Sequence, residues 1–277
     1  MPAFICDTCG AQYPDSNYEP GHCSICEDER QYIGWQGQQF TTLERLRERL
    51  RADIRRQEPG LAGIGSEPSF AIGQRALLIH NMGGNVLWDC ISLLDDEIVE
   101  YVSSLGGIGT IAISHPHYYT SMVDWARAFD ARICLHAADR QWVTRPDERI
   151  DFWDGDQLEL ESGITLLRLG GHFAGGTVLH WAEGQEGRGA LLSGDIVQVV
   201  QDRRWVSFMR SYPNLIPLSS SDVRQIVSRL APYQFARIYG AWFGRVVADD
   251  AKNALERSAE RYLRALEAGF TGEGTNG

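Results

Sequence analysis

Short apolar β runs separated by glycine-containing turns fill residues 69–196, and this feature constrains the fold more than any other. The runs expected to form strands are SFAIG, ALLIHN, NVLWDC, TIAISH, ARICLH, LELESGITLLRLGG, TVLHW and ALLSGDI. Helical patterns lie near residues 94–105, 119–129, 220–231 and 249–268. Two groups of strands with helices between and after them predict an α/β fold in which paired sheets are covered by helices.

Four cysteines near the N-terminus form the pattern C-x₂-C-x₁₃-C-x₂-C: Cys6, Cys9, Cys23 and Cys26. Two such pairs on a segment too short for its own core are typical of a structural Zn²⁺ site with four thiolate ligands. We therefore expect residues 1–35 to form a zinc ribbon. The ribbon has six acidic residues against the single Arg30, which argues against nucleic-acid binding and favours a packing or partner-docking role.

Residues 36–68 are predicted to be a helix followed by a linker. A capping box of Thr41 and Glu44 and a leucine-rich face predict a helix over 41–57, and EPGLAGIGSEP reads as the linker. The main domain is expected over 69–270, with a disordered tail at 271–277.

Composition limits the partners. The chain has 277 residues and a net charge of −11, which argues against nucleic acid or an anionic membrane as a partner. It has no apolar run long enough to span a membrane and no signal-peptide pattern at its start, so we expect a cytoplasmic protein. Cys90 and Cys134, each alone in an apolar run, are expected to be small buried hydrophobes.

Residue types that bind metals stand at the ends of several β runs. His115 and His117 follow TIAIS, His172 follows LLRLGG, Asp195 ends ALLSG and Asp89 ends NVLW. Side chains at strand ends are rigidly placed and face the loop layer, where sites are built. Pro116 favours extended backbone between the two histidines, which would direct both imidazoles to one side.

The order of these motifs, with HPH, GGHFAGGTV and LLSGD, resembles the metallo-β-lactamase fold superfamily over roughly residues 69–245. The resemblance implies an αββα sandwich with a metal site at one edge, between the sheets. It matches His115, His117 and His172 to the histidines of the first metal site. It also matches Asp195 to the carboxylate that bridges two ions, and Asp89 to a buried carboxylate that braces the metal loops.

The second metal site of that superfamily lacks its ligands here. It requires Asp at 119, His at 120 and a further His near 241–243, where this chain has Tyr119, Thr120, Ala241, Trp242 and Phe243. We therefore predict one zinc or iron ion in the main domain, held by three histidines and Asp195. Trp242 and Phe243 are expected to wall an apolar pocket. Two roles are open for Tyr119: a catalytic hydrogen-bond donor to a developing oxyanion, or a packing residue of the following helix.

The resulting hypothesis is a mononuclear metal-dependent hydrolase of a small ester, thioester or lactone that uses a metal-bound hydroxide. The alternatives are a non-catalytic, metal-stabilised binding protein and a mononuclear iron oxygenase, although the latter type normally keeps the Asp that Tyr119 replaces. We expect a small-molecule substrate, with assembly into a homo-oligomer left open. Residues 205–218 are expected to form a lid or a substrate wall, and His80 to border the site.

Overall fold

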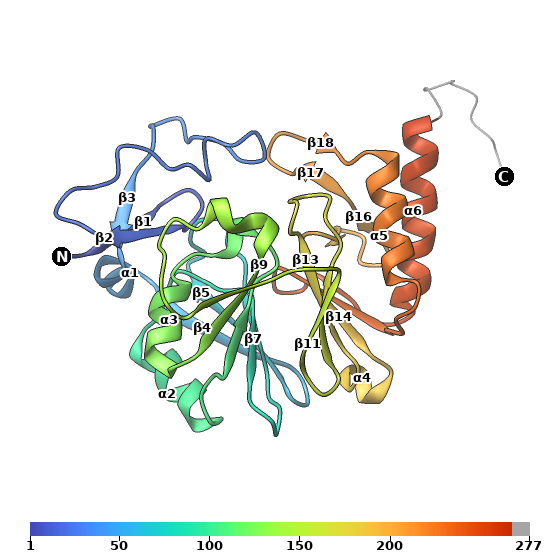
Figure 1. Ribbon diagram of the computed structural model, residues 1–277, viewed down its shortest axis with the longest axis horizontal. Coiled ribbons are helices and arrows are strands. Elements are labelled where there is room, and N and C mark those ends of the chain that lie inside the picture. The colour runs from blue at the N-terminus through green and yellow to red at the C-terminus, as the bar shows by residue number, and fades with distance from the viewer. Residues whose placement is uncertain (268–277) are drawn as a thin grey trace.

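The computed structural model describes residues 1–267, so the tail predicted at 271–277 lies outside the described residues (Figure 1). A seven-stranded sheet forms one half of the main domain. In spatial order its strands are β10 (Ile150–Trp153), β9 (Arg132–His136), β8 (Thr110–Ala112), β7 (Val86–Trp88), β6 (Ala76–Ile79), β5 (Leu61–Glu67) and β4 (Arg51–Glu58). The strands from β10 to β7 pair in parallel, and those from β7 to β4 pair antiparallel.

A six-stranded sheet forms the other half. In spatial order its strands are β11 (Gln157–Glu161), β12 (Ile164–Arg168), β13 (Thr177–Trp181), β14 (Ala190–Gly194), β19 (Arg237–Gly240) and β20 (Val246–Val247). The β14–β19 pair is parallel and the other pairs are antiparallel. Two small hairpins follow β14: β15 (Gln198–Val199) with β16 (Val206–Ser207), and β17 (Met209–Ser211) with β18 (Ile216–Pro217).

Side-chain alternation along the strands creates the layers. In β6, Leu77 and Ile79 belong to the core between the two sheets, whereas Leu78 faces the helices on the outside. In β13, Leu179 faces the inter-sheet core and Val178 the opposite helical layer. Strands buried on both faces read as continuous apolar runs for this reason.

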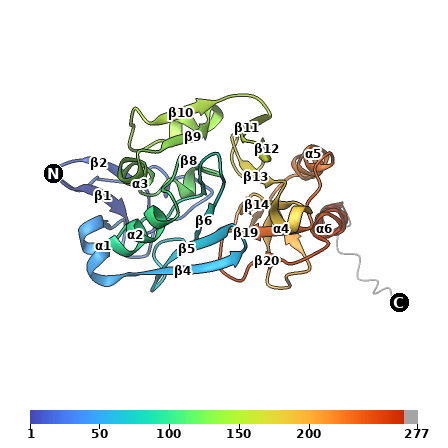
Figure 2. The same cartoon turned by 90° about the horizontal axis from the view of Figure 1, so that it is seen from below.

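Helices cover both outer faces (Figures 1 and 2). α2 (Asp96–Ser104) and α3 (Met122–Phe129) pack on the seven-stranded sheet, and α5 (Ser220–Leu230) and α6 (Ala251–Glu267) pack on the six-stranded sheet. A short helical turn, α4 (Gly184–Gly187), and two 3₁₀ helices, η1 (Pro116–Tyr118) and η2 (Ala137–Trp142), lie in loops. The predicted αββα sandwich is therefore confirmed.

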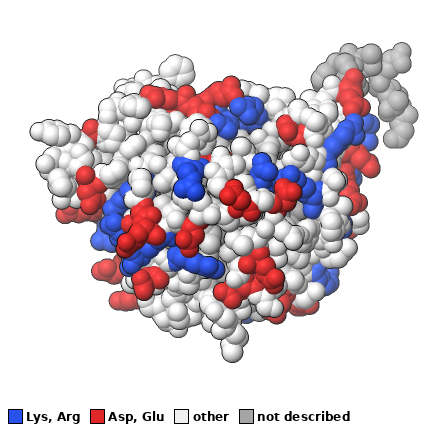
Figure 3. Space-filling view, in the orientation of Figure 1, with Lys and Arg blue, Asp and Glu red and all other residues white. Residues whose placement is uncertain are grey.

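The N-terminal ribbon is a three-stranded sheet of β2 (Gln12–Asp15), β1 (Ala3–Cys6) and β3 (Phe40–Thr42). It lies against the loops at one end of the sandwich and runs through β3 directly into α1 (Leu43–Arg49) (Figure 1). Acidic and basic side chains are interspersed on the face in Figure 3, with red groups gathered along the ribbon's edge.

The helix predicted over 41–57 is confirmed only over Leu43–Arg49, where Thr42 instead of Thr41 caps it, and the linker predicted over 58–68 is wrong. Residues from Arg51 onward form β4, which pairs along its whole length with β5 of the main sheet. β5, the strand with which β4 pairs, could not be predicted because its sequence LAGIGSE contains two glycines and lacks a strand pattern. Gly63 and Gly65 leave room for the ring of Phe243, since a Cβ at either position would lie within 2.8 Å of that ring. Tertiary pairing has overridden local helix propensity.

One predicted strand is also wrong. SFAIG, residues 69–73, is a turn closed by a hydrogen bond from the Gly73 amide to the Phe70 carbonyl. Cys90 and Cys134 are buried in apolar surroundings, as expected. None of the described helices is both long and apolar enough to cross a membrane.

Candidate metal centre and active site

The end of β8 positions the first two histidines. His115 is extended, and Pro116 begins the 3₁₀ helix η1, which carries His117. The predicted extended pair is therefore wrong in detail, because Pro116 is favourable as the first residue of a helical turn and starts one here. Both imidazoles are nevertheless buried, with ring centroids 5.1 Å apart.

His172 and Asp195 come from the other sheet. His172 follows β12 after two glycines, and Asp195 follows the last residue of β14, Gly194. Gly194 has a φ of +54°, and a Cβ there would lie 2.6 Å from Ser114 Oγ. Only glycine lets the ends of β8 and β14 approach so closely, and this approach brings Asp195 to the histidines.

The four side chains converge on one point. His117 Nδ1 lies 3.3 Å from His172 Nε2, and Asp195 Oδ1 lies 3.3 Å from His115 Nε2 and 4.0 Å from His172 Nε2. A tetrahedral zinc ion with ligands at about 2.0 to 2.1 Å holds them about 3.4 Å apart. The spacing therefore fits one ion.

Buried atoms without partners support the same fit. His115 Nε2, His117 Nε2 and Asp195 Oδ1 are buried and have no hydrogen-bond partner among the described residues. Buried polar atoms are rarely left unpaired because each costs a desolvation penalty. A cation among them would satisfy His115 Nε2 and Asp195 Oδ1.

Two of the histidines are held by hydrogen bonds on the side away from the cluster. His172 Nδ1 donates to the Met209 carbonyl over 3.1 Å, and His115 Nδ1 is hydrogen-bonded to Ser114 Oγ over 2.8 Å. Such contacts fix the tautomer and leave Nε2 free as a ligand. Asp89 accepts the Ser114 amide over 2.8 Å, which confirms it as a brace for the metal loop.

Burial also sets the charge states. It lowers the pKa of His115 and His117 well below the usual range and that of His172 to about 4. Burial raises the pKa of Asp195 to about 7. The imidazoles are therefore neutral at physiological pH, which is the form that binds metal.

Tyr118, rather than the predicted Tyr119, reaches this cluster. Its hydroxyl donates to Asp195 Oδ2 over 3.0 Å, and its ring lies 4.3 Å from that of His115. Tyr119 is buried in the core beneath α3 and does not line the cavity. The catalytic role for Tyr119 is therefore wrong and the packing role holds.

A cavity of about 300 Å³ opens onto the cluster. Its lining residues come from the ribbon and both halves of the sandwich: Thr8, Gln31, Tyr32, Ala71, Ile72, His117, His172, Asp195, Gln198, Tyr212, Pro213 and Trp242. None of these described residues is Lys or Arg, and Asp195 is the one acidic group among them. Trp242 lines the cavity as expected. Phe243 does not, because its ring packs over the glycines of β5.

Residues 205–218 form a wall of this cavity, as expected. Tyr212 and Pro213 line it, and the Tyr212 hydroxyl donates to the Asp195 carbonyl over 2.7 Å. Three ribbon residues, Thr8, Gln31 and Tyr32, were missed, because nothing in their local sequence marks them as part of a site. The Gln31 side chain is buried and its Oε1 has no partner among the described residues.

Other histidines have separate roles. His136 and His180 are hydrogen-bonded to the backbone carbonyls of Gly155 and Gln234. His80 is hydrogen-bonded to Asn85 and lies outside the metal-site cavity, so the expectation that it borders the site is wrong.

The four cysteines form a second candidate metal site. Their sulfurs lie 3.7 Å apart for Cys6 and Cys26 and 3.6 Å apart for Cys9 and Cys23, and all four are buried free thiols. A tetrahedral zinc with Zn–S distances of about 2.3 Å places its sulfurs about 3.8 Å apart. The compact cluster fits a zinc ion.

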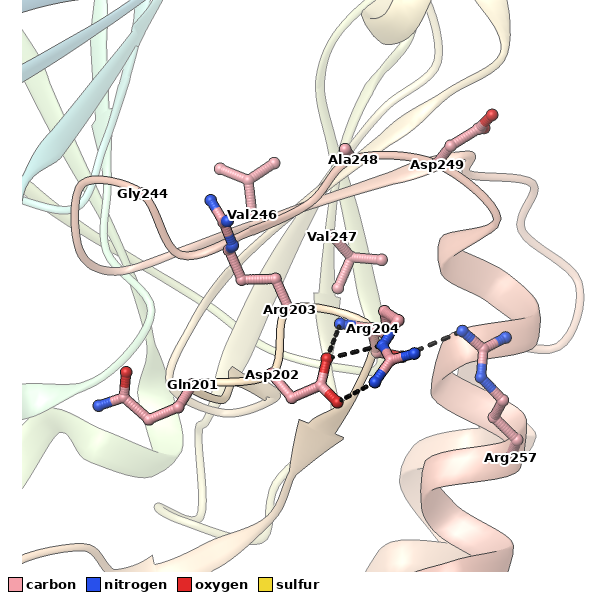
Figure 4. Close-up of a pocket in the computed structure, with 10 residues that line it drawn as sticks. All are labelled: Gln201, Asp202, Arg203, Arg204, Gly244, Val246, Val247, Ala248, Asp249 and Arg257. Atoms are coloured by element: carbon pink, nitrogen blue, oxygen red, sulfur yellow. Dashed lines mark hydrogen bonds and ion pairs between the residues drawn. The ribbon is translucent and has the colours of Figure 1, made fainter.

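A larger cavity, of about 660 Å³, lies between the β15–β16 hairpin and β20 (Figure 4). Arg204 there is paired with Asp202, and Arg257 with Asp250. Among the described residues, neither the four-cysteine group nor the three-histidine group lines this larger cavity. We therefore place the candidate active site at the histidine cluster.

Known proteins agree with this architecture. No family model matches the chain. The Bacillus subtilis (strain 168) protein YmaE, described as uncharacterized, is 52% identical over 270 residues, which are 97% of this chain and 98% of YmaE.

Solved metallo-β-lactamase structures are similar in fold. VMB-1 has a TM-score of 0.57 at 12% identity, covering 78% of this chain and 98% of its own. DIM-1, exposed to ceftazidime, has a TM-score of 0.56 at 13% identity, and the match covers 79% of this chain and 98% of DIM-1. A HARLDQ-motif mutant metallo-β-lactamase from Cronobacter sakazakii (Enterobacter sakazakii) has a TM-score of 0.52 at 19% identity. That match covers 78% of this chain and 96% of the enzyme. The chain therefore belongs to the same family as YmaE and has the fold of the metallo-β-lactamases, to which it adds an N-terminal four-cysteine ribbon.

Proposed function

We propose that this protein is a metal-dependent hydrolase with a single catalytic ion, acting on a small neutral ester, thioester or lactone. The observation that carries the proposal is the meeting of His115, His117, His172 and Asp195 at tetrahedral spacing, with unpartnered buried atoms, on the wall of a small cavity. The three neutral imidazoles and Asp195 Oδ1 would hold the ion. Such an ion lowers the pKa of a bound water to about 7 and polarises a carbonyl.

A single ion is favoured by what surrounds Asp195. In a two-ion site the second carboxylate oxygen would face the second ion, whereas here Asp195 Oδ2 accepts the Tyr118 hydroxyl. The side chain of Thr120, at the position of a second-site histidine, packs against the ribbon at Gly10 instead. Trp242 stands in the cavity wall where another ligand would be needed.

The residues around the cluster suggest how catalysis proceeds. Asp195 would act through the ion: its Oδ1 lies 3.3 Å from His115 Nε2 and would be one of the ligands, and the ion would lower the pKa of the attacking water. Tyr118 keeps Oδ2 engaged, so the carboxylate keeps one orientation. Ile72, Pro213 and Trp242 give the cavity apolar lining, and an apolar lining strengthens electrostatic interactions near it.

The lining also favours neutral substrates. A phosphodiester needs two cations or an arginine cluster to offset its charge, and none of the described lining residues is Lys or Arg. A volume of about 300 Å³ lies at the lower end of the range for ligand pockets. We therefore propose a small-molecule substrate, with no nucleic-acid or membrane partner and with the homo-oligomeric state left to measurement.

The proposal includes a structural zinc in the ribbon and a cytoplasmic location. The four sulfurs are spaced for a tetrahedral ion, and the cysteines of the chain are free thiols, as is usual in a reducing compartment.

Turnover of a panel of nitrophenyl esters, thioesters and lactones by the metal-loaded protein tests the proposal, with His172→Ala as the inactive control. Metal analysis accompanies it, because bound iron together with oxygen consumption would favour the oxygenase instead. Full metal loading with no turnover of any acyl substrate would favour the non-catalytic alternative. Efficient hydrolysis of a phosphodiester would contradict the neutral-substrate argument.

A further inference from the structure

The ribbon's one basic residue, Arg30, points into the protein. It is only 8% exposed, and its guanidinium lies 4.0 Å from the centre of the Phe173 ring. Its Nη1 donates to the His172 carbonyl over 3.4 Å, while Asp28 pairs with the same guanidinium. Arg30 therefore connects the four-cysteine segment to His172, a candidate metal ligand, and to its neighbour Phe173.

Phe173 transmits this contact to the whole histidine cluster. Its ring centroid lies 5.6 Å from that of His115, 4.9 Å from that of His117 and 5.1 Å from that of His172. A cation over an aromatic face contributes about 0.5 to 2 kcal/mol, with the larger values at desolvated sites. Arg30 thus holds the ring against which all three imidazoles pack.

A second connection runs through the β17–β18 hairpin. Ser211 Oγ donates to the Arg30 carbonyl over 3.1 Å, and Asn214 Nδ2 donates to the carbonyls of Glu29 and Gln31 over 3.0 and 2.9 Å. The same hairpin supplies the Met209 carbonyl that accepts the His172 Nδ1 proton. Figure 1 shows the ribbon loop reaching β17 and β18.

We propose that Arg30 is a positioning residue for His172, so that an ordered, metal-bound ribbon is needed for high-affinity metal binding at the histidine cluster. Arg30 lies four residues after Cys26, so the four-thiolate site fixes its position. The inference rests on the metal sites of the proposed function but not on hydrolysis. It assigns the ribbon a part in building the active site instead of an independent docking role.

Arg30→Met tests the proposal, with Arg30→Lys as the conservative variant and Arg49→Met as the matched control. Arg49 also belongs to the N-terminal region, but it is half-exposed, pairs with Asp7 at 3.4 Å and lies over the Phe70 ring, away from the histidine cluster. Cobalt(II) substitution separates the two sites, because the thiolate site alone gives a sulfur-to-cobalt charge-transfer band. Chelator competition then gives the affinity of the histidine site.

We expect Arg30→Met to keep the charge-transfer band and to weaken the histidine site about 10- to 100-fold, as losses of ligand-orienting contacts do. Arg30→Lys should be intermediate, because lysine keeps the charge without the planar fork. Nitrogen NMR of the imidazoles should show a mixture of tautomers at His172 in Arg30→Met and a single Nδ1–H tautomer in the wild type and in Arg49→Met. A purely structural role would not move this tautomer.

The proposal is overturned if Arg30→Met binds both ions as the wild type does, or if it loses the thiolate band, since Arg30 would then support the ribbon alone. A second variant, Cys9→Ser with Cys26→Ser, must lose the ribbon ion and also weaken the histidine site. Retention of wild-type affinity there would equally refute the coupling. A wild-type protein that binds only the thiolate-held ion would refute the proposed metal site itself, before any variant is compared.

Discussion

Replacing Tyr118 by Phe removes one hydroxyl from a fully buried contact and leaves the ring in place. That hydroxyl donates to Asp195 Oδ2 over 3.0 Å. A hydrogen bond to a charged group contributes about 1.5 to 3 kcal/mol, and no solvent screens this one. Because the contact also orients Oδ1 toward the histidines, we expect Tyr118→Phe to raise the dissociation constant of the main-domain ion about 10- to 100-fold.

Tyr119→Phe is the matched control. Tyr119 is the neighbouring tyrosine, it is equally buried, and the described residues offer its hydroxyl no recorded hydrogen bond. Chelator competition on both variants should show the loss of affinity only in Tyr118→Phe, with similar melting temperatures for the two metal-free proteins after allowance for the buried hydrogen bond. Equal losses in both variants, or a Tyr118→Phe affinity within threefold of the wild type, would refute the assignment of Asp195 as a ligand oriented by Tyr118.

Three further outcomes are expected. Purified protein should contain about two metal equivalents by elemental analysis, falling to about one in His115→Ala with His172→Ala, and three equivalents in the wild type would mean a second ion in the main domain. Gln31→Leu should raise KM for small acyl substrates and leave kcat little changed, because the variant loses a buried amide that lines the cavity but keeps the histidine cluster. An unchanged KM would exclude Gln31 from substrate contact. Gly194→Ala should lower the free energy of unfolding by about 1 to 3 kcal/mol in denaturant titration, because Gly194 has a left-handed φ of +54° and a Cβ there would press on Ser114. An unfolding midpoint equal to that of the wild type would show that the ends of β8 and β14 separate easily.

The ligand positions could be predicted because each is a local feature. His115, His172 and Asp195 all stand just after an apolar strand, and strand ends meet at one edge of paired sheets. Cys6, Cys9, Cys23 and Cys26 could be predicted because the spacing of thiolate pairs is itself the signal. The histidines and the cysteines each come together in space as those patterns indicate, and Asp195 lies 3.3 Å from His115.

The mistake between Tyr118 and Tyr119 has a geometric cause. The prediction for Tyr119 rests on its standing at the position where the resemblance places a second-site Asp, which says nothing about the local direction of the chain. The chain makes a 3₁₀ turn over Pro116–Tyr118, and side chains three residues apart are eclipsed in such a turn. Tyr118 therefore lies over His115 and reaches Asp195. Local sequence gave no sign of the turn beyond the proline.

The docking of the ribbon could not be predicted because its contacts join residues far apart in the chain. The bond from Arg30 to the His172 carbonyl spans 142 positions. The same difficulty hid β4 and β5, whose pairing depends on a sheet that forms from later residues. Periodicity describes one segment at a time and is silent about which surface that segment will meet.

Thr120 connects the ribbon to the loop that follows the first two histidines. This residue stands where a second-site histidine would be, has a φ of +38°, and accepts the amide of Gln12 through its carbonyl. A Cβ at Gly10 would lie 3.3 Å from the Thr120 methyl group and 2.6 Å from Ser92 Oγ. A histidine at position 120 would collide with the ribbon in this arrangement. The loop that contains Thr120 is thus part of the surface on which the ribbon docks.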